Sequence, residues 1–318
     1  MRAAVLLLLG MLAGPAAAAE SYPGRTVEIV VPYGPGGTGD IIARQLARKF
    51  EEQFGKAFIV VNKPGGAGIL GASSVARAQA DGHTLLLGYT LEIAIAPFLG
   101  ATGYEPSSFE PIAIAGETPL LLIGRKTLAA NTMRELIDVL RSSPQPFTYA
   151  GTGRGAPSHI AGELLKRQAK LDIRQVPYRG GAQAVADVLG GHVDIYFSGM
   201  PPAVPLVRNG DIKAFAVTGE RRSSALPDVP TMAESGFASF DLSGWFALFA
   251  PKGTPAGVLE QLRGATRSAL ADKTVQETLN QNGVDVRTNP TERVREFIDA
   301  ESGKYRSLIA ELGIEAEK

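Results

Sequence analysis

The chain has no cysteine and only three histidines among its 318 residues. Without cysteine there can be no disulfide, no zinc–thiolate site and no thiol nucleophile. Basic and acidic residues number 32 each, so there is no surplus of positive charge to neutralise a nucleic acid or an anionic membrane surface. With 45% apolar and 20% charged residues, the composition is that of a folded soluble protein.

Long hydrophobic runs are also absent, apart from a short one at the N-terminus. Arg2, the apolar run 5–12 and the small residues 16–19 together predict a secretory signal peptide over residues 1–19. The alternative is a membrane anchor, but this run is far shorter than the roughly 20 residues that cross a bilayer. We therefore expect cleavage near Ala19 and a mature protein free in the periplasm.

Short apolar runs of strand length alternate with helical patterns along the rest of the chain. This alternation predicts an α/β fold with mostly parallel sheets. The predicted strands are 26–31, 56–61, 83–88, 120–124, 147–150, 173–176, 193–197 and 214–218, and the predicted helices are 40–54, 133–140, 160–168, 182–189, 258–270 and 294–309.

The mature length is too great for one ordinary core and predicts two lobes. Segments 100–108 and 226–236 are rich in Gly, Pro and Ser and divide the chain near one third and two thirds. We expect lobe 1 to combine residues 20–122 and 226–318, and lobe 2 to comprise residues 123–225. A hinged cleft would then separate the lobes, with the last helix lying on lobe 1.

The first candidate binding loop, 32–40, lies between a strand and a helix, where ligands bind in doubly wound sheets. It contains Tyr33, Gly36, Gly37, Thr38 and Asp40. Its glycines allow close backbone approach, and the unpaired amides of the helix start favour an anion. We expect Asp40 to cap this helix. Two alternatives stay open: a nicotinamide site, since the loop matches G-x-G-x-x-G without the expected acid after the next strand, and a simple tight turn.

Two further loops occupy the same position between a strand and a helix. In loop 151–158, Thr152 and Gly153 precede Arg154, which could clamp a carboxylate or be an ordinary solvated arginine. Ser158 is the expected N-cap of the helix that follows. No Lys-Ser or Lys-Thr pair follows this loop, which excludes a Walker-type phosphate site.

In the third loop, 177–181, Tyr178 could line a pocket while Gly180 exposes its amide.

Catalytic machinery is not visible in the sequence. His159 and Glu163 are four residues apart on one helix and could share a metal, but no third ligand is near, so His159 is expected to stack under its own loop. No nucleophile elbow and no assignable acid–base pair occurs. We expect no enzyme activity, no metal and no cofactor.

A series of motifs spanning nearly the whole mature chain resembles the Bug family of periplasmic solute receptors, which serve tripartite tricarboxylate transporters. Each motif is short, but their order and number make the resemblance specific. The motifs are Tyr22-Pro23, IVVPY (29–33), PGG (35–37), VNKPGGAG (61–68), DGHTLL (81–86), 159–164, VPYRG (176–180), GGHVD (190–194) and LPDVPT (226–231).

This resemblance implies a two-lobed, type II Venus flytrap that holds a small carboxylate mainly through backbone amides and bridging water. It places ligand contacts in the three loops above, with His159 directly after the second, and in segment 88–92, which contains Tyr89, Thr90 and Glu92. It also implies membrane permease subunits as partners. We expect a monomer that captures a di- or tricarboxylate, an aromatic acid or an amino acid. The alternatives are a sensor receptor for a membrane kinase and a secreted hydrolase or transferase.

Two residues depart from the family pattern. Relatives often have a small polar residue and then a histidine where this chain has Leu91 and Glu92. An ionised Glu92 would repel a bound anion unless the ligand also carries an amine, or unless the side chain turns outward to cap a helix. Arg154 stands where relatives usually have a small or neutral residue, and it could pair with the ligand or with Glu92.

Overall fold

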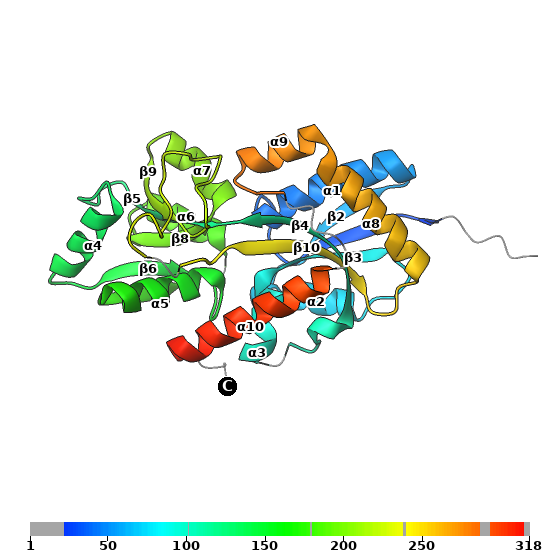
Figure 1. Ribbon diagram of the computed structural model, residues 1–318, viewed down its shortest axis with the longest axis horizontal. Helices are drawn as coiled ribbons and strands as arrows, with labels where there is room; N and C mark the ends of the chain where they lie inside the picture. The colour runs from blue at the N-terminus through cyan, green and yellow to red at the C-terminus, as the bar shows by residue number, and fades with distance from the viewer. Residues whose placement is uncertain (1–21, 101, 179, 238–239, 287–292, 315–318) are drawn as a thin grey trace, which may run out of the picture.

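The computed structural model describes residues 22–100, 102–178, 180–237, 240–286 and 293–314, so the predicted signal peptide lies outside the described residues. The described chain forms two lobes, each built around a five-stranded sheet (Figure 1). In lobe 1 the strand order is β2 (Phe58–Asn62), β1 (Val27–Val31), β3 (Thr84–Tyr89), β10 (Gly244–Pro251) and β4 (Phe109–Thr118). In lobe 2 it is β7 (Ile173–Pro177), β6 (Phe147–Gly151), β8 (Ile195–Gly199), β5 (Leu120–Arg125) and β9 (Ile212–Val217).

The two sheets share one pairing pattern. β1 is parallel to β2 and β3, while β10 is antiparallel to β3 and β4. In the same way β6 is parallel to β7 and β8, and β5 is antiparallel to β8 and β9. The predicted two-lobed α/β architecture is confirmed, and each sheet is mixed because one strand runs against its neighbours.

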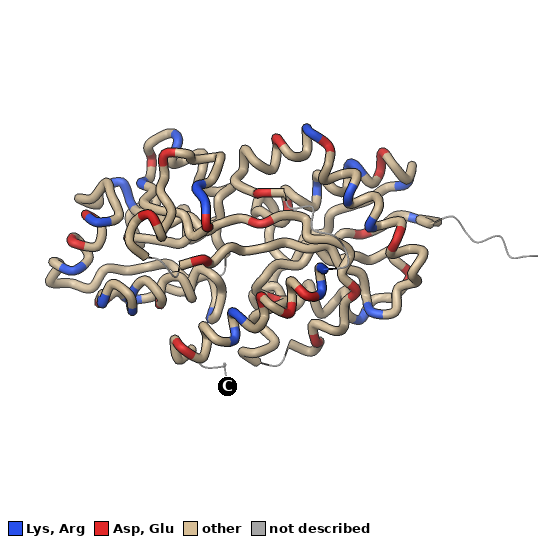
Figure 2. Tube along the Cα trace, in the orientation of Figure 1, with Lys and Arg blue, Asp and Glu red and all other residues tan. Residues whose placement is uncertain are grey.

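Helices cover the faces of both sheets, because the sheets bury apolar residues on both sides. No helix among the described residues is long and apolar enough to span a membrane. Figure 2 shows Lys and Arg interspersed with Asp and Glu over both lobes. The helices are α1 (Thr38–Phe54), α2 (Ile69–Ala76), α3 (Ala96–Leu99), α4 (Met133–Ser142), α5 (Pro157–Ala169), α6 (Gly181–Leu189), α7 (Met200–Arg208), α8 (Ala256–Ala271), α9 (Lys273–Gln281) and α10 (Val294–Leu312), with short turns η1 (Gly66–Gly68), η2 (Leu91–Ile95, a π-helix) and η3 (Pro106–Ser108).

The main chain crosses between the lobes where β4 leads into β5 and where β9 returns to β10. Thr218 joins these two crossings, because its hydroxyl accepts the Leu120 N–H and donates to the Leu242 carbonyl, each at 2.9 Å. The second sheet therefore begins at Leu120. The lobe boundaries predicted from composition, 123–225 for lobe 2, stay predictions.

Helix α10 lies on lobe 1 as predicted, and it also contacts lobe 2, which the sequence did not indicate (Figure 1). Its first half buries Val294 and Ile298 in the lobe 1 core beside Trp245. Its second half buries Tyr305 and Ile309 in a cluster with α5 of lobe 2. The apolar pattern identified this helix correctly, but periodicity cannot say which partner each turn meets.

Candidate functional site

The candidate site lies where loops of the two lobes meet at the carboxyl ends of their strands. A Cβ at Gly199 of lobe 2 would lie 3.5 Å from Thr38 Oγ1, and one at Gly153 would lie 3.6 Å from Ala67 Cβ. Gly199 is the last residue of β8, Gly153 follows β6, and Thr38 begins the helix after β1. The first predicted loop therefore meets lobe 2 at Gly199, and the second meets lobe 1 at Ala67.

Four helices that follow β1, β6, β7 and β8 begin without a side-chain cap. Their N-cap residues are Gly37 (α1), Ala156 (α5), Gly180 (α6) and Gly199 (α7), and none accepts a first-turn amide through its side chain. The amides of a helix's first turn have no partner inside the helix and carry partial positive charge. These helix starts therefore provide backbone donors suited to an anion.

Asp40 is not the N-cap of α1, and that prediction is wrong because the helix begins two residues earlier, at Thr38. Its carboxylate instead accepts the Gly36 N–H at 3.1 Å, the Asn62 amide at 3.1 Å and the Arg44 guanidinium at 2.9 Å. Burial disfavours the ionised form, but these bonds outweigh it and lower the pKa of Asp40. Asp40 thus holds the glycine loop in place from inside the protein.

The loop after β6 is closed by its own side chains. Ser158 is not an N-cap, because α5 begins after Ala156; its hydroxyl accepts the Thr152 N–H at 3.2 Å and lies 2.9 Å from the Thr152 hydroxyl. His159 Nδ1 accepts the Gly155 N–H at 3.0 Å, so the histidine lies under its own loop as expected. Burial lowers the pKa of His159 and favours the neutral ring.

Arg154 is exposed on the same loop, whereas the Glu92 side chain is fully buried. Among the described residues no ion pair joins the two, so the predicted Arg154–Glu92 pair is not formed. Arg154 nevertheless has an interaction of its own within the protein.

Segment 88–92 connects the end of β3 to the π-helical turn η2 in lobe 1. The Thr90 hydroxyl is fully buried and accepts the Trp245 N–H at 2.8 Å, which fixes this segment to β10. Glu92 Oε1 accepts the Tyr89 N–H at 2.6 Å, and Oε2 accepts the Tyr33 hydroxyl at 2.7 Å. The alternative in which Glu92 turns outward is wrong, because none of its surface is exposed. Burial raises the pKa of Glu92 to about 7, although these two bonds favour the ionised form.

Aromatic rings surround this carboxyl group. The rings of Tyr33 and Tyr89 meet edge to face at 6.0 Å, and Tyr89 stacks on Phe246 at 4.6 Å. From lobe 2, the Tyr196 phenol interacts with Tyr89, and a Cβ at Gly181 would lie 3.2 Å from its hydroxyl oxygen. The sequence reasoning missed Tyr196, although its place near the carboxyl end of β8 is a signal that could have identified it.

In the third predicted loop, the Tyr178 side chain is bonded within lobe 2. The Tyr178 hydroxyl donates to Asp187 on α6 at 2.7 Å, and its backbone N–H donates to the Gly151 carbonyl at 2.8 Å. The phenol is therefore fixed to its own helix, while Gly180 remains the uncapped start of α6.

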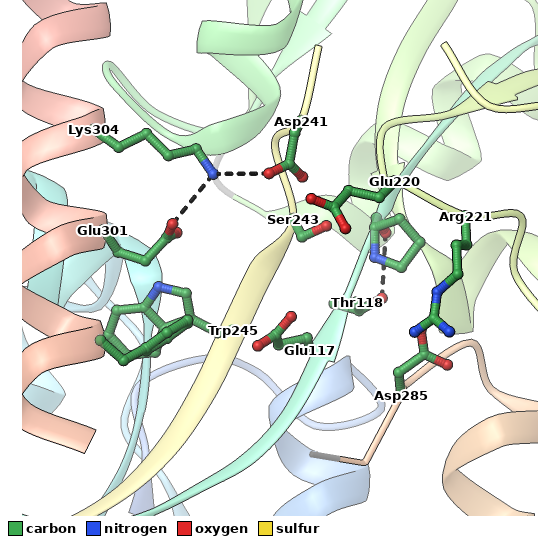
Figure 3. A pocket seen from close by; sticks show the side chains of 13 residues that line it. Glu117, Thr118, Glu220, Arg221, Asp241, Ser243, Trp245, Asp285, Glu301 and Lys304 are labelled. Atoms are coloured by element: carbon green, nitrogen blue, oxygen red, sulfur yellow. Dashed lines mark hydrogen bonds and ion pairs between the residues drawn. The ribbon is translucent and has the colours of Figure 1, made fainter. Parts of the chain in front are cut away.

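A separate cavity of about 150 Å³ lies at the lobe crossings (Figure 3). Lys304 of α10 donates there to Asp241 at 3.3 Å and to Glu301 at 3.2 Å. Carboxylates outnumber cations in its lining, but no group of three or more potential ligands in the described part of the chain could hold a metal ion. This cavity lies at the hinge, apart from the loops that face each other between the lobes.

Comparison with known proteins gives consistent results. Residues 42–314 match the family model described as "Tripartite tricarboxylate transporter family receptor". The structure of the periplasmic binding protein BugD is 35% identical with a TM-score of 0.87, covering 93% of this chain and 100% of that one. Rpa4515 of R. palustris with adipate is 30% identical (TM-score 0.89; 93% and 100% covered), and MatC of Rhodopseudomonas palustris with bound malate is 31% identical (TM-score 0.83; 91% and 100% covered).

Proposed function

Because the chain belongs to the tripartite tricarboxylate transporter receptor family, we propose that it captures a small carboxylate between its two lobes in the periplasm and delivers it to membrane permease subunits. The family consists of solute-binding receptors, and the protein is accordingly a binding protein and not an enzyme. Two similar proteins hold the dicarboxylates adipate and malate, which supports the same ligand class here.

The observation that carries this proposal is the set of uncapped helix starts, Gly37 in lobe 1 and Ala156, Gly180 and Gly199 in lobe 2. Backbone amides from both lobes can contact one anion only when the lobes are together. A carboxylate therefore stabilises the closed arrangement more than the open one and shifts the population toward it.

The other predicted site residues take supporting places in this proposal. The rings of Tyr33 and Tyr89 line the lobe 1 side of the proposed site, and Thr152 and Gly153 belong to the loop after β6 that forms the lobe 2 side. Asp40, Thr90, Ser158 and His159 have their polar atoms engaged by the protein itself, and we assign them the role of holding the loops.

A thermal-shift screen of the mature protein tests the proposal. The panel contains mono-, di- and tricarboxylates, aromatic acids and amino acids, with uncharged diols of the same length as controls. At a concentration about 100 times Kd, a bound acid adds about 2.7 kcal/mol to the free energy of unfolding. The Tm should then rise by several degrees for a few acids and for none of the diols. If no acid raises the Tm and calorimetry detects no binding, the proposal is wrong.

A further inference from the structure

The Glu92 carboxyl group is enclosed by three segments of lobe 1. Oε1 is bonded to the backbone at Tyr89 and Oε2 to the hydroxyl of Tyr33. The third segment passes so close that a Cβ at Gly68 would lie 3.0 Å from both Oε2 and the Tyr33 hydroxyl oxygen. Gly68 has φ +94°, which also favours glycine. The local backbone is therefore shaped around this carboxyl–phenol pair.

No cation balances Glu92 among the described residues. The titratable groups facing it are phenols: Tyr33 from the loop after β1, Tyr89 from β3, and Tyr104, whose hydroxyl donates to the Glu92 carbonyl at 2.7 Å. Helix α10 presents Tyr305, whose phenol interacts with Tyr89, and Arg306, which lies 4.2 Å over the Phe98 ring.

The remaining neighbours of this segment leave Glu92 uncompensated as well. Segment η1 contributes only Gly66, Ala67 and Gly68. The facing loop of lobe 2 carries His159, whose Nδ1 is engaged by Gly155, and the exposed Arg154.

The hydrogen bond between Glu92 and Tyr33 can run in two directions. When Glu92 is ionised it can only accept, so the Tyr33 proton points at Oε2 and the phenol offers only lone pairs elsewhere. When Glu92 is protonated, its own O–H can donate to the Tyr33 oxygen. The Tyr33 proton is then released from Glu92. Its other acceptor within the protein is the Ala67 carbonyl at 3.4 Å, a long hydrogen bond that a better-placed carboxylate oxygen can replace.

Tyr33 lies where a ligand could contact its hydroxyl, so the availability of its proton would affect binding. It is half-buried in the loop that precedes the uncapped start of α1, and the neighbouring Ala67 approaches Gly153 of lobe 2. A carboxylate at this contact needs donors, and a phenol that donates only to Glu92 cannot serve it.

We propose that Glu92 and Tyr33 form a proton-linked switch, in which protonation of Glu92 releases the Tyr33 hydroxyl to donate to a bound carboxylate. This inference rests on the proposed function. It resolves the conflict between an acidic side chain and an anionic ligand, because the glutamate becomes neutral when the ligand arrives.

Proton uptake on binding follows from this switch. A negative ligand near Glu92 favours its neutral form, so binding of one carboxylate should take up close to one proton at a pH where free Glu92 is ionised. Because burial raises the pKa of Glu92 to about 7, affinity should fall by up to about tenfold per pH unit above that value.

Calorimetry with adipate and with malate, from about pH 6.5 to about pH 8.5, tests the switch. Titrations in two buffers of different ionisation enthalpy measure the protons taken up. Glu92→Gln is the central variant: its Oε1 can still accept from Tyr89, and its amide always donates to the Tyr33 oxygen, as a protonated Glu92 would. We expect the wild type to take up protons and to weaken as the pH rises. Glu92→Gln should bind with little pH dependence and more tightly than wild type at the highest pH.

Tyr33→Phe provides the second variant, because it removes the donor while keeping the ring. It should bind the same acid more weakly than wild type at low pH and show no proton uptake. A wild type that binds either acid without proton uptake, a Glu92→Gln variant that keeps the wild-type pH slope, or an affinity that rises with pH would overturn the switch but leave carboxylate binding intact. Failure of every acid in the thermal-shift screen would instead overturn the proposed function itself.

Discussion

At the scale of single residues, two buried carboxylates of lobe 1 have opposite environments. Asp40 is surrounded by the Gly36 amide, the Asn62 amide and Arg44, so it remains ionised. Glu92 has only the Tyr89 amide and the Tyr33 phenol, so burial dominates and raises its pKa. The same chemical group therefore serves as a fixed structural anion in one place and as a titratable group in the other.

Glu92→Gln should stabilise the protein above neutral pH. Folding raises the pKa of the Glu92 carboxyl to about 7, so it stays protonated to a higher pH in the folded state than in the unfolded state. Its contribution to stability is therefore favourable at low pH and is lost as the pH rises from the unfolded pKa of 4.5 through 7. The loss amounts to about 3 kcal/mol at most, and glutamine avoids it. Urea unfolding of both proteins across this range measures the difference.

The matched control for this measurement is Glu260→Gln, because Glu260 is exposed on α8. Its difference from wild type gives the effect of removing a surface carboxylate at each pH. If the stability difference for Glu92→Gln stays constant across the range, Glu92 does not titrate as described.

Arg154→Ala should weaken a dicarboxylate more than a monocarboxylate of similar length. Arg154 is exposed on the glycine loop after β6, where its guanidinium can clamp the distal carboxylate of a bound diacid. Loss of such a charge-assisted contact costs about 1.5–3 kcal/mol, or roughly 10- to 100-fold in Kd. Calorimetry with one diacid and the matching monoacid measures the two losses. Equal losses for both acids would exclude the clamp.

At the scale of secondary-structure elements, the sequence predicted the segments whose pattern is local. All eight predicted strands are present within two residues or so of their expected ends, because short Val- and Ile-rich runs mark them. Strand β4 was missed because Pro111 and Gly116 interrupt it; the proline is tolerated since β4 lies at the sheet edge. Strand β10 was missed although its run Trp245–Ala250 is apolar, as expected of a strand buried on both faces.

The binding loops were also predicted from local sequence patterns, but the contacts of their side chains were not. Gly-rich turns between a strand and a helix can be recognised along the chain. Whether Ser158 and Asp40 act as N-caps, however, depends on the residue at which each helix begins. The burial of Glu92 depends on Tyr33 and Gly68, which lie far from it in sequence. Contacts of this kind are set by tertiary packing and leave no periodic signal.

Helix α10 provides a third link between the lobes, and Tyr305 lies where it crosses. The phenol is fully buried with α5, and its hydroxyl lies 3.4 Å from the Ser243 carbonyl near the return crossing. Tyr305→Ala should lower the free energy of unfolding by about 3–5 kcal/mol, as expected for removing a large buried ring. Tyr305→Phe keeps the ring and should cost only about 1 kcal/mol. Urea unfolding compares the two; similar losses would show that the hydroxyl, and not the packing across the lobes, dominates.

At the scale of the whole molecule, the proposed function requires that the two lobes approach each other closely at their loops. Two crossings, joined by Thr218, and the contacts of α10 connect the lobes. Two glycines of lobe 2 approach lobe 1 closely: Gly153 lies near Ala67, and Gly155 lies near Ile95 and Leu99. Glycine at these positions leaves the space that closure needs.

Gly155→Ala should weaken ligand binding as well as lower the free energy of unfolding. Gly155 has φ +71°, and an added Cβ would overlap Leu99 Cδ1 from the opposite lobe. The backbone strain alone costs roughly 1–2 kcal/mol wherever it occurs. Gly210→Ala is the matched control, because Gly210 has φ +70° and open space around its Cα. Gly155→Ala should lose more stability in urea than Gly210→Ala, because the overlap with Leu99 adds to the backbone strain. Only Gly155→Ala should bind the acid found in the screen more weakly and show incomplete compaction with it in small-angle X-ray scattering. Shortening the opposing side chain in Gly155→Ala/Leu99→Ala should restore compaction, since the overlap is then removed. Equal affinities for the two single variants would mean that this interlobe contact does not limit closure.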